Sequence, residues 1–91
     1  MFHILTITYT QPAEIIAEAR PAHLTWLQGE IETGRLILTG RLESQQGGVL
    51  ITGDISTEAA EELMAADPYT LAGLVHYDRV SFTGGVRAAG L

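Results

Sequence analysis

The chain has 91 residues, of which 46% are hydrophobic and 18% charged, and its five basic and eleven acidic residues give a net charge of −6. This length predicts one small domain, 1–91. The acidic balance argues against nucleic acid as a partner, and no basic amphipathic stretch suggests binding to a membrane surface. The absence of cysteine excludes disulfides, thiolate nucleophiles, iron–sulfur clusters and cysteine zinc sites.

The start of the chain carries no recognisable targeting signal. Residues 1–6 lack the basic region and cleavage site of a signal peptide, and no apolar run approaches the roughly 20 residues of a membrane-spanning helix. We therefore expect a cytoplasmic protein. The high apolar content also favours self-association, because small domains often bury part of their apolar surface between subunits.

A strand and an interrupted helix are predicted for the first part of the chain. Residues 2–10 are rich in β-branched and aromatic types, which is typical of a strand. Pro12 suits the first turn of a helix over 13–19. Pro21 is expected to interrupt that helix, to move Arg20 out of the α conformation and to begin a second helical piece.

The second helical piece and a pair of strands follow. The piece is predicted to end at Gly34. Its apolar residues recur at helical spacing, with Trp26 beside them: Leu24, Leu27 and Ile31. Residues 35–42 and 49–54 then form strands joined by a loop over 44–48.

The last part of the chain predicts a helix and a fourth strand. Ser56 is a plausible N-cap for a helix that runs to about Ala66. Asp67 precedes a proline and so leaves the α conformation. A short turn leads to a strand over 74–82, and the tail, residues 84–91, has no pattern and is expected to be flexible or swapped onto a partner.

The predicted order is βαββαβ, the ferredoxin-like arrangement of the α+β class. A four-stranded antiparallel sheet then carries both helices on one face. The other face should also be apolar, because one alternating set of the first strand contains Phe2 and Ile4 and the other contains Leu5 and Ile7. An exposed apolar face requires a partner. We therefore predict a homodimer through the open sheet face, with a cleft between the layers that binds a small molecule.

Two polar residues beside prolines are the candidates for chemistry. His23 is expected on the opening turn of the second helical piece, and Asp67 lies where the last helix must stop before Pro68. If the fold joins these ends, the carboxylate would fix the tautomer of an imidazole that takes and returns a proton. The structural alternatives are an exposed or structural histidine and an aspartate that accepts backbone N–H bonds at a turn.

Four more residues are candidates for substrate binding. Arg20 could hold a carboxylate or phenolate oxygen, and Trp26 and Tyr69 could wall an aromatic ring. Ser44 could add a hydrogen bond at the rim of the site. The alternatives are a surface ion pair for the arginine, core packing for the aromatic residues and loop structure for the serine.

Neither a metal site nor a cofactor is predicted. His3 and His76 fall on strands that pair in a ferredoxin-like sheet, but a metal ion would need a third ligand, for which Asp78 is the only nearby candidate. The glycine-rich segments match neither the Walker A pattern nor the dinucleotide fingerprint.

Several segments follow one another as in a known family: FHILTITYT, RPAHLTWL, GRLILTGRL and AADPYxxAGL. On these segments the chain resembles the YCII-related (YciI-like) family along nearly its whole length, up to Thr83. The resemblance implies a dimeric ferredoxin-like α+β barrel. It also implies an active site built on a histidine and an aspartate, which carry over to His23 and Asp67. Some related proteins are dehydrochlorinases of chlorinated hydroxyaromatic compounds or lie near muconolactone-type isomerases.

Three functional hypotheses follow. The first is a small cofactor-free enzyme, a lyase or isomerase, that uses a His23–Asp67 acid–base dyad on a small cyclic or aromatic metabolite. The second is a non-catalytic ligand-binding or accessory module whose cleft binds a small anion. The third is a cofactor-free oxygenase of the wider dimeric α+β barrel class, which no motif favours.

Overall fold

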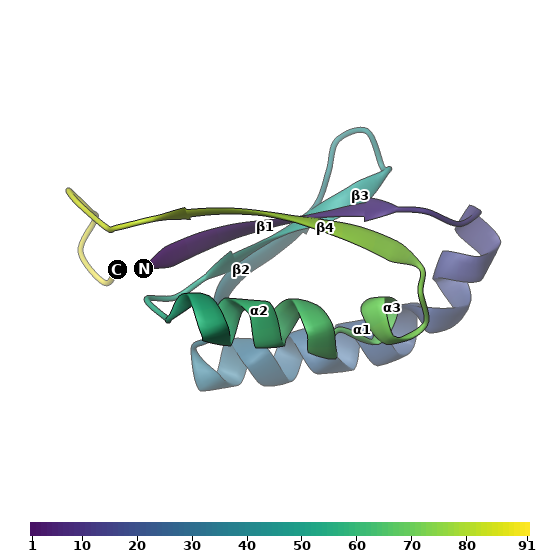
Figure 1. The fold of residues 1–91 in the computed structure, drawn as a ribbon, viewed down its shortest axis with the longest axis horizontal. Coiled ribbons are helices and arrows are strands. Elements are labelled where there is room, and N and C mark those ends of the chain that lie inside the picture. Colours follow the sequence, from purple (N-terminus) through teal and green to yellow (C-terminus); the bar gives the residue numbers. More distant parts are fainter.

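Four antiparallel strands form one sheet in the order β2-β3-β1-β4 in the computed structural model, which describes residues 1–91 (Figure 1). The elements in chain order are β1 (Phe2–Tyr9), α1 (Ala13–Thr33), β2 (Leu36–Arg41), β3 (Gly47–Thr52), α2 (Thr57–Ala66), α3 (Pro68–Leu71) and β4 (Val75–Phe82). Apart from the single turn of α3, this is the predicted βαββαβ order. The ferredoxin-like α+β fold is therefore confirmed.

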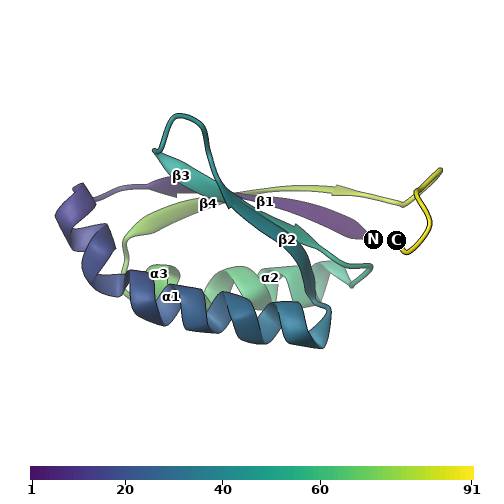
Figure 2. The ribbon, with the colours of Figure 1, turned by 180° about the vertical axis from the view of Figure 1, so that it is seen from behind.

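All three helices cover the same face of the sheet, as the two opposite views in Figures 1 and 2 show. The alternation of β1 fits this layering, because His3, Leu5 and Ile7 are buried while Ile4 and Thr6 between them are partly exposed. One face of the sheet thus packs under the helices and the other stays open.

Helix α1 differs from the sequence-based prediction. It continues through Pro21 as one helix of 21 residues, so the predicted interruption is wrong and Arg20 is helical. Figure 2 shows that the first turns of α1 lie at an angle to the rest, which is the bend that an internal proline produces. Burial of Ile16 before the bend and of Leu27 after it holds both parts on the sheet. His23 therefore lies midway along a long helix and not on an opening turn.

The segment after α2 is more ordered than the predicted turn. Asp67 has φ −56° and ψ 126°, so it ends α2 and begins the single turn of α3. Its side chain caps that turn by accepting from the Tyr69 N–H at 2.9 Å. The predicted N-cap of α2 is confirmed, because the Ser56 hydroxyl accepts from Ala59 N–H at 3.1 Å.

The core consists of two apolar clusters. The larger joins the sheet to α1 and α2 through Leu5, Ile7, Leu27, Leu36, Leu50 and Leu63. The smaller packs the start of α1 against α3 and the chain that follows it through Ile16, Tyr69 and Leu74. Burial of the Tyr69 ring in this second cluster fixes α3, and with it the orientation of Asp67, the residue that caps α3.

The outer face of the sheet is apolar over the part that carries Phe2, Ile4, Val80 and Phe82, whereas the other end carries Thr6, Thr8, His76 and Asp78. Leu38 and Val80 are 60% and 62% exposed there, and Phe2 stacks on Phe82 at 5.9 Å between ring centroids. The tail turns back beside this end of the sheet, where Arg87 lies 5.1 Å from the centroid of the Phe2 ring. No helix combines the length and apolarity that a membrane span requires.

Candidate active site

Asp67 is a fully buried carboxylate held by three donors. One oxygen accepts from His23 Nδ1 at 2.7 Å and from the Tyr69 N–H at 2.9 Å. The other accepts from the Tyr77 hydroxyl at 2.5 Å. Residues from α1, α3 and β4 thus converge on one carboxylate, which is 0% exposed. Its cap at α3 and its contact with His23 use the same oxygen, so the structural and chemical interpretations of Asp67 coexist.

The His23 ring is oriented from two sides. It stacks on Tyr69 with 3.9 Å between centroids and 11° between planes, and Nδ1 donates to Asp67. Because the carboxylate accepts, the proton resides on Nδ1 and leaves Nε2 as the basic nitrogen. Nε2 makes no hydrogen bond within the chain. Every fully buried side-chain nitrogen or oxygen has a partner, so Nε2 keeps some exposed area, and His23 lines a cavity.

Tyr77 completes the support of the carboxylate. Burial, and then the neighbouring charge of Asp67, raise the pKa of the Tyr77 phenol well above its ordinary value. The phenol therefore remains a hydrogen-bond donor to Asp67 throughout the neutral range. This hydrogen bond and the Tyr69 N–H hold Asp67 in a fixed orientation toward His23.

A cavity of about 260 Å³ lies between α1 and strands β1, β2 and β3. Gly48 lines this cavity, and a Cβ there would lie 2.8 Å from the Gly40 carbonyl oxygen, so β2 and β3 approach closely at this point. At the neighbouring Gly47, a Cβ would lie 1.7 Å from the Ile7 carbonyl oxygen, so only glycine fits this close approach of the strands. The polar side chains that line the cavity are Tyr9, Arg20, His23, Thr39, Arg41 and Tyr69.

Arg20 and Tyr69 lie together at this cavity. Interaction with the Tyr69 hydroxyl, and less strongly with that of Tyr9, raises the pKa of Arg20 above its ordinary value. Burial raises the pKa of Tyr69, although Arg20 acts in the opposite direction. The arginine is half-buried and forms no salt bridge, so no carboxylate of the chain neutralises its charge.

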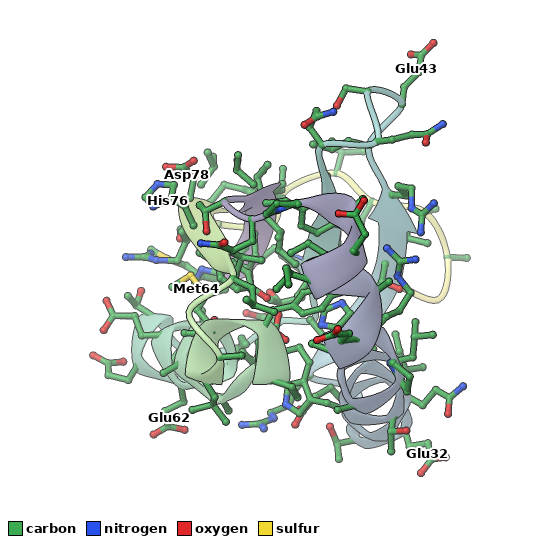
Figure 3. The ribbon with its side chains drawn as sticks, turned by 90° about the vertical axis from the view of Figure 1, so that its right-hand side faces the viewer. Glu32, Glu43, Glu62, Met64, His76 and Asp78 are labelled. Carbon is green, nitrogen blue, oxygen red and sulfur yellow. The ribbon has the colours of Figure 1, made fainter.

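Two of the predicted substrate-binding residues do not line the cavity. Trp26 is half-buried against the main core, with its ring 6.0 Å from that of His23. Ser44 is exposed on the β2–β3 loop, where its hydroxyl accepts from the Gln46 N–H at 3.2 Å. Figure 3 shows the adjacent Glu43 at the tip of that hairpin, projecting away from the helices.

The other histidines are not brought together. His3 pairs with Ser81 and His76 with Thr8, so they lie at opposite ends of the β1–β4 ladder. Figure 3 shows His76 and Asp78 beside each other at the outer edge of the sheet. No three histidine, aspartate or glutamate side chains cluster as a metal site would require.

Sequence reasoning missed Tyr77 and Arg41. Tyr77 lies two residues after Val75 in the predicted last strand. The two-residue period of a strand places both side chains on the face that the helices cover. Arg41 pairs with Gly48, which pairs with Ile7, so a sheet register would have placed it on the same face. The alternation was visible, but the register depends on the tertiary pairing.

The family comparison covers the part of the chain that contains the site. The family described as YCII-related domain matches residues 1–82. The chain belongs to this family. The YCII match includes His23, Asp67 and Tyr77 and ends before the tail. No curated protein matches the chain.

A solved structure has the same fold. The 5-chloro-2-hydroxyhydroquinone dehydrochlorinase (TftG) from Burkholderia phenoliruptrix AC1100, in complex with 2,5-dihydroxybenzoquinone, matches with a TM-score of 0.74. The identity is 18%, and the match covers 93% of this chain and 96% of that chain. At this identity the likeness establishes the fold.

Proposed function

We propose that the protein is an enzyme in which His23 and Asp67 act as an acid–base dyad on a small cyclic compound. The observation that carries this proposal is the 2.7 Å hydrogen bond from His23 Nδ1 to Asp67, combined with an unpaired Nε2 on a histidine that lines the cavity. Imidazole takes and returns a proton near neutral pH, and a buried carboxylate stabilises the imidazolium formed between these steps.

The reaction class is proton transfer coupled to isomerisation or to loss of a leaving group. Nε2 would take the proton of a ring hydroxyl, and the imidazolium would return it to a ring carbon. If that carbon bears a halogen, the halide then leaves with the bonding electrons and a second hydroxyl releases its proton, so that the overall loss is one molecule of hydrogen halide. The dehydrochlorinase name of TftG supports the lyase form of this proposal.

The cavity supports a ligand of one ring. An apolar cavity of about 150 Å³ accommodates benzene, so about 260 Å³ suits a ring with a few substituents. Tyr69, already stacked on His23, and Arg20 would contact this ligand. Leu27 and Leu50 would supply its apolar contacts.

Chloride release from 5-chloro-2-hydroxyhydroquinone under anaerobic conditions tests the catalytic proposal. We expect release above the buffer rate, and a rate roughly a hundredfold lower in His23→Gln, which is the usual scale of general acid–base catalysis. Binding of 2,5-dihydroxybenzoquinone should persist in the variant. Asp78→Asn, which changes an exposed carboxylate outside the cavity, is the matched control and should retain the full rate.

Two results would count against the enzyme. Equal chloride release by the parent protein and His23→Gln would remove His23 from the reaction. Tight binding of the benzoquinone without release of chloride by the parent protein would favour the non-catalytic ligand-binding module.

A homodimer through the outer sheet face is the second part of the proposal. Its support is the exposed apolar surface that includes Leu38, Val80 and Phe82. Light scattering should give about twice the 9.8 kDa of one chain. The Leu38→Lys/Val80→Lys variant should be monomeric, whereas Leu71→Lys, at a more exposed leucine on the helical side, should remain dimeric. A monomeric parent protein would exclude the dimer.

A further inference from the structure

Two arginines at the cavity have no carboxylate partner. The chain has only five basic residues, all arginines, against eleven acidic ones. Arg35 and Arg79 each pair with a glutamate, at 2.6 and 3.6 Å. Arg20 and Arg41 form no salt bridge, yet both line the cavity. In an acidic chain, two guanidinium groups on one hollow form a local positive charge that an anion would stabilise.

These arginines lie where two hollows adjoin. Arg20, Arg41 and Tyr9 line the cavity that contains His23, and they also line a second hollow of about 450 Å³ beside the start of α1 and the β2–β3 loop. Residues shared by two adjoining hollows stand at their boundary. His23 lines only the first hollow, so the arginines and the basic Nε2 occupy different parts of the same cavity.

The sheet register leaves room for a ring between these groups. Arg41 pairs with Gly48, and Gly48 pairs with Ile7 across the sheet. Because Gly48 has no side chain, only backbone lines the cavity between Arg41 and Ile7 at this register position. A flat ring can therefore lie over Gly48 with one edge at the arginines and the other toward the Tyr69–His23 stack.

We infer that Arg20 and Arg41 form an anion subsite and that a single-ring acid is the preferred substrate. The ring-borne carboxylate binds the two guanidinium groups, which match its planar geometry. The inference rests on the proposed function for the orientation of the ring toward His23, but the subsite itself does not depend on catalysis. Arg41, a residue of β2 that the dyad does not touch, thereby becomes a determinant of specificity.

Calorimetry with benzoate and its neutral isostere benzamide tests the subsite on the purified full chain. Benzoate should bind at least about tenfold more tightly than benzamide, because it makes charge-assisted hydrogen bonds. Arg41→Gln and Arg20→Gln should each weaken benzoate binding about tenfold and leave benzamide unchanged. Arg87→Gln removes the same charge outside the cavity and should bind benzoate like the parent protein.

Further variants separate charge from folding and from catalysis. Arg20→Lys keeps the charge and should restore part of the affinity that Arg20→Gln loses. His23→Gln should keep the preference for benzoate, so the subsite can be verified even if the catalytic proposal fails. The inference is overturned by equal binding of benzoate and benzamide, by no benzoate binding up to millimolar concentration, or by arginine variants that bind as the parent does. Inorganic phosphate that binds more tightly than benzoate would overturn the assignment to a ring-borne carboxylate.

Discussion

Two histidines are buried between the sheet and the helices, and their hydrogen bonds differ. His3 is 0% exposed and engages both ring nitrogens within the chain, Nδ1 with the Ser81 hydroxyl at 2.7 Å and Nε2 with the Ile55 carbonyl at 3.0 Å. His23 engages only Nδ1, with Asp67 at 2.7 Å. Burial alone does not separate the two residues, but the free nitrogen does.

The hydrogen-bond partners also impose opposite tautomers. A carbonyl only accepts, so His3 carries its proton on Nε2, and the Ser81 hydroxyl, which accepts from Arg79 at 2.6 Å, donates to Nδ1. At His23 the carboxylate accepts from Nδ1, so Nε2 is the basic nitrogen. The hydrogen bonds of His3 therefore connect β1 to β4 and to the residue Ile55 just before α2. His23 instead keeps an unpaired basic nitrogen and lines the cavity.

Loss of the Asp67 carboxylate should give the largest effect. Asp67→Ala leaves the His23, Tyr69 and Tyr77 donors without their acceptor in a buried site. We expect a loss of about 3–5 kcal/mol in the free energy of unfolding, the scale observed when a buried pair loses one partner. Urea unfolding measures this loss, and Asp67→Asn should recover part of it. A loss below about 1 kcal/mol would show that these donors find other partners.

His3→Ala tests the comparison from the structural side. The substitution removes a buried ring and leaves the Ser81 hydroxyl and the Ile55 carbonyl unpaired, so we expect a loss of about 2–4 kcal/mol in the free energy of unfolding. Turnover per folded molecule should match that of the parent protein. His23→Gln should show the opposite weighting, with turnover about a hundredfold lower and a loss of only about 1 kcal/mol in the free energy of unfolding, because the amide can still donate to Asp67. A loss of turnover in His3→Ala without unfolding would show that His3 also contributes to catalysis.

Much of the fold follows from the sequence because its signals are local. The alternation of residues 2–10 and the stop at Gly34, which has φ 80°, predict the elements, and their order leaves few topologies. The local rule failed at Pro21, because burial of α1 on both sides of the proline outweighs one lost hydrogen bond of the helix. The contribution of tertiary packing cannot be derived from the dipeptide around Pro21.

The site was predictable only in part. His23 and Asp67 are identified by their segments, but Tyr77 and Arg41 reach the site through the register of the sheet. Ser44 was a candidate for substrate binding because of its hydroxyl. That hydroxyl lies on the β2–β3 loop and accepts a hydrogen bond from the Gln46 N–H. Register and loop direction arise from pairing between distant segments, which a single sequence does not specify.

The free energy of unfolding at alkaline pH should depend on the Tyr77–Asp67 hydrogen bond. The pKa of Tyr77 is raised in the folded state, so above about pH 10 the unfolded chain releases this proton while the folded chain keeps it. The unfolded chain then binds fewer protons, and the free energy of unfolding falls as pH rises, by up to about 1.4 kcal/mol per pH unit. Urea unfolding at pH 8 and pH 11 should show a smaller fall in Tyr77→Phe. An equal fall in both proteins would place the titration on another group.

The third histidine should give the smallest effect. His76 lies on the open edge of the sheet, 65% exposed, and its contact with Asp78 is 3.3 Å long. An exposed pair of this kind contributes about 0–1 kcal/mol, and the contribution falls with added salt. His76→Ala should therefore shift the free energy of unfolding by less than about 0.5 kcal/mol and leave turnover unchanged. His76→Ala thus serves as the baseline against which the effects of His3→Ala and His23→Gln are measured. A larger effect would mean that a partner covers the outer edge of β4 in solution and contacts His76.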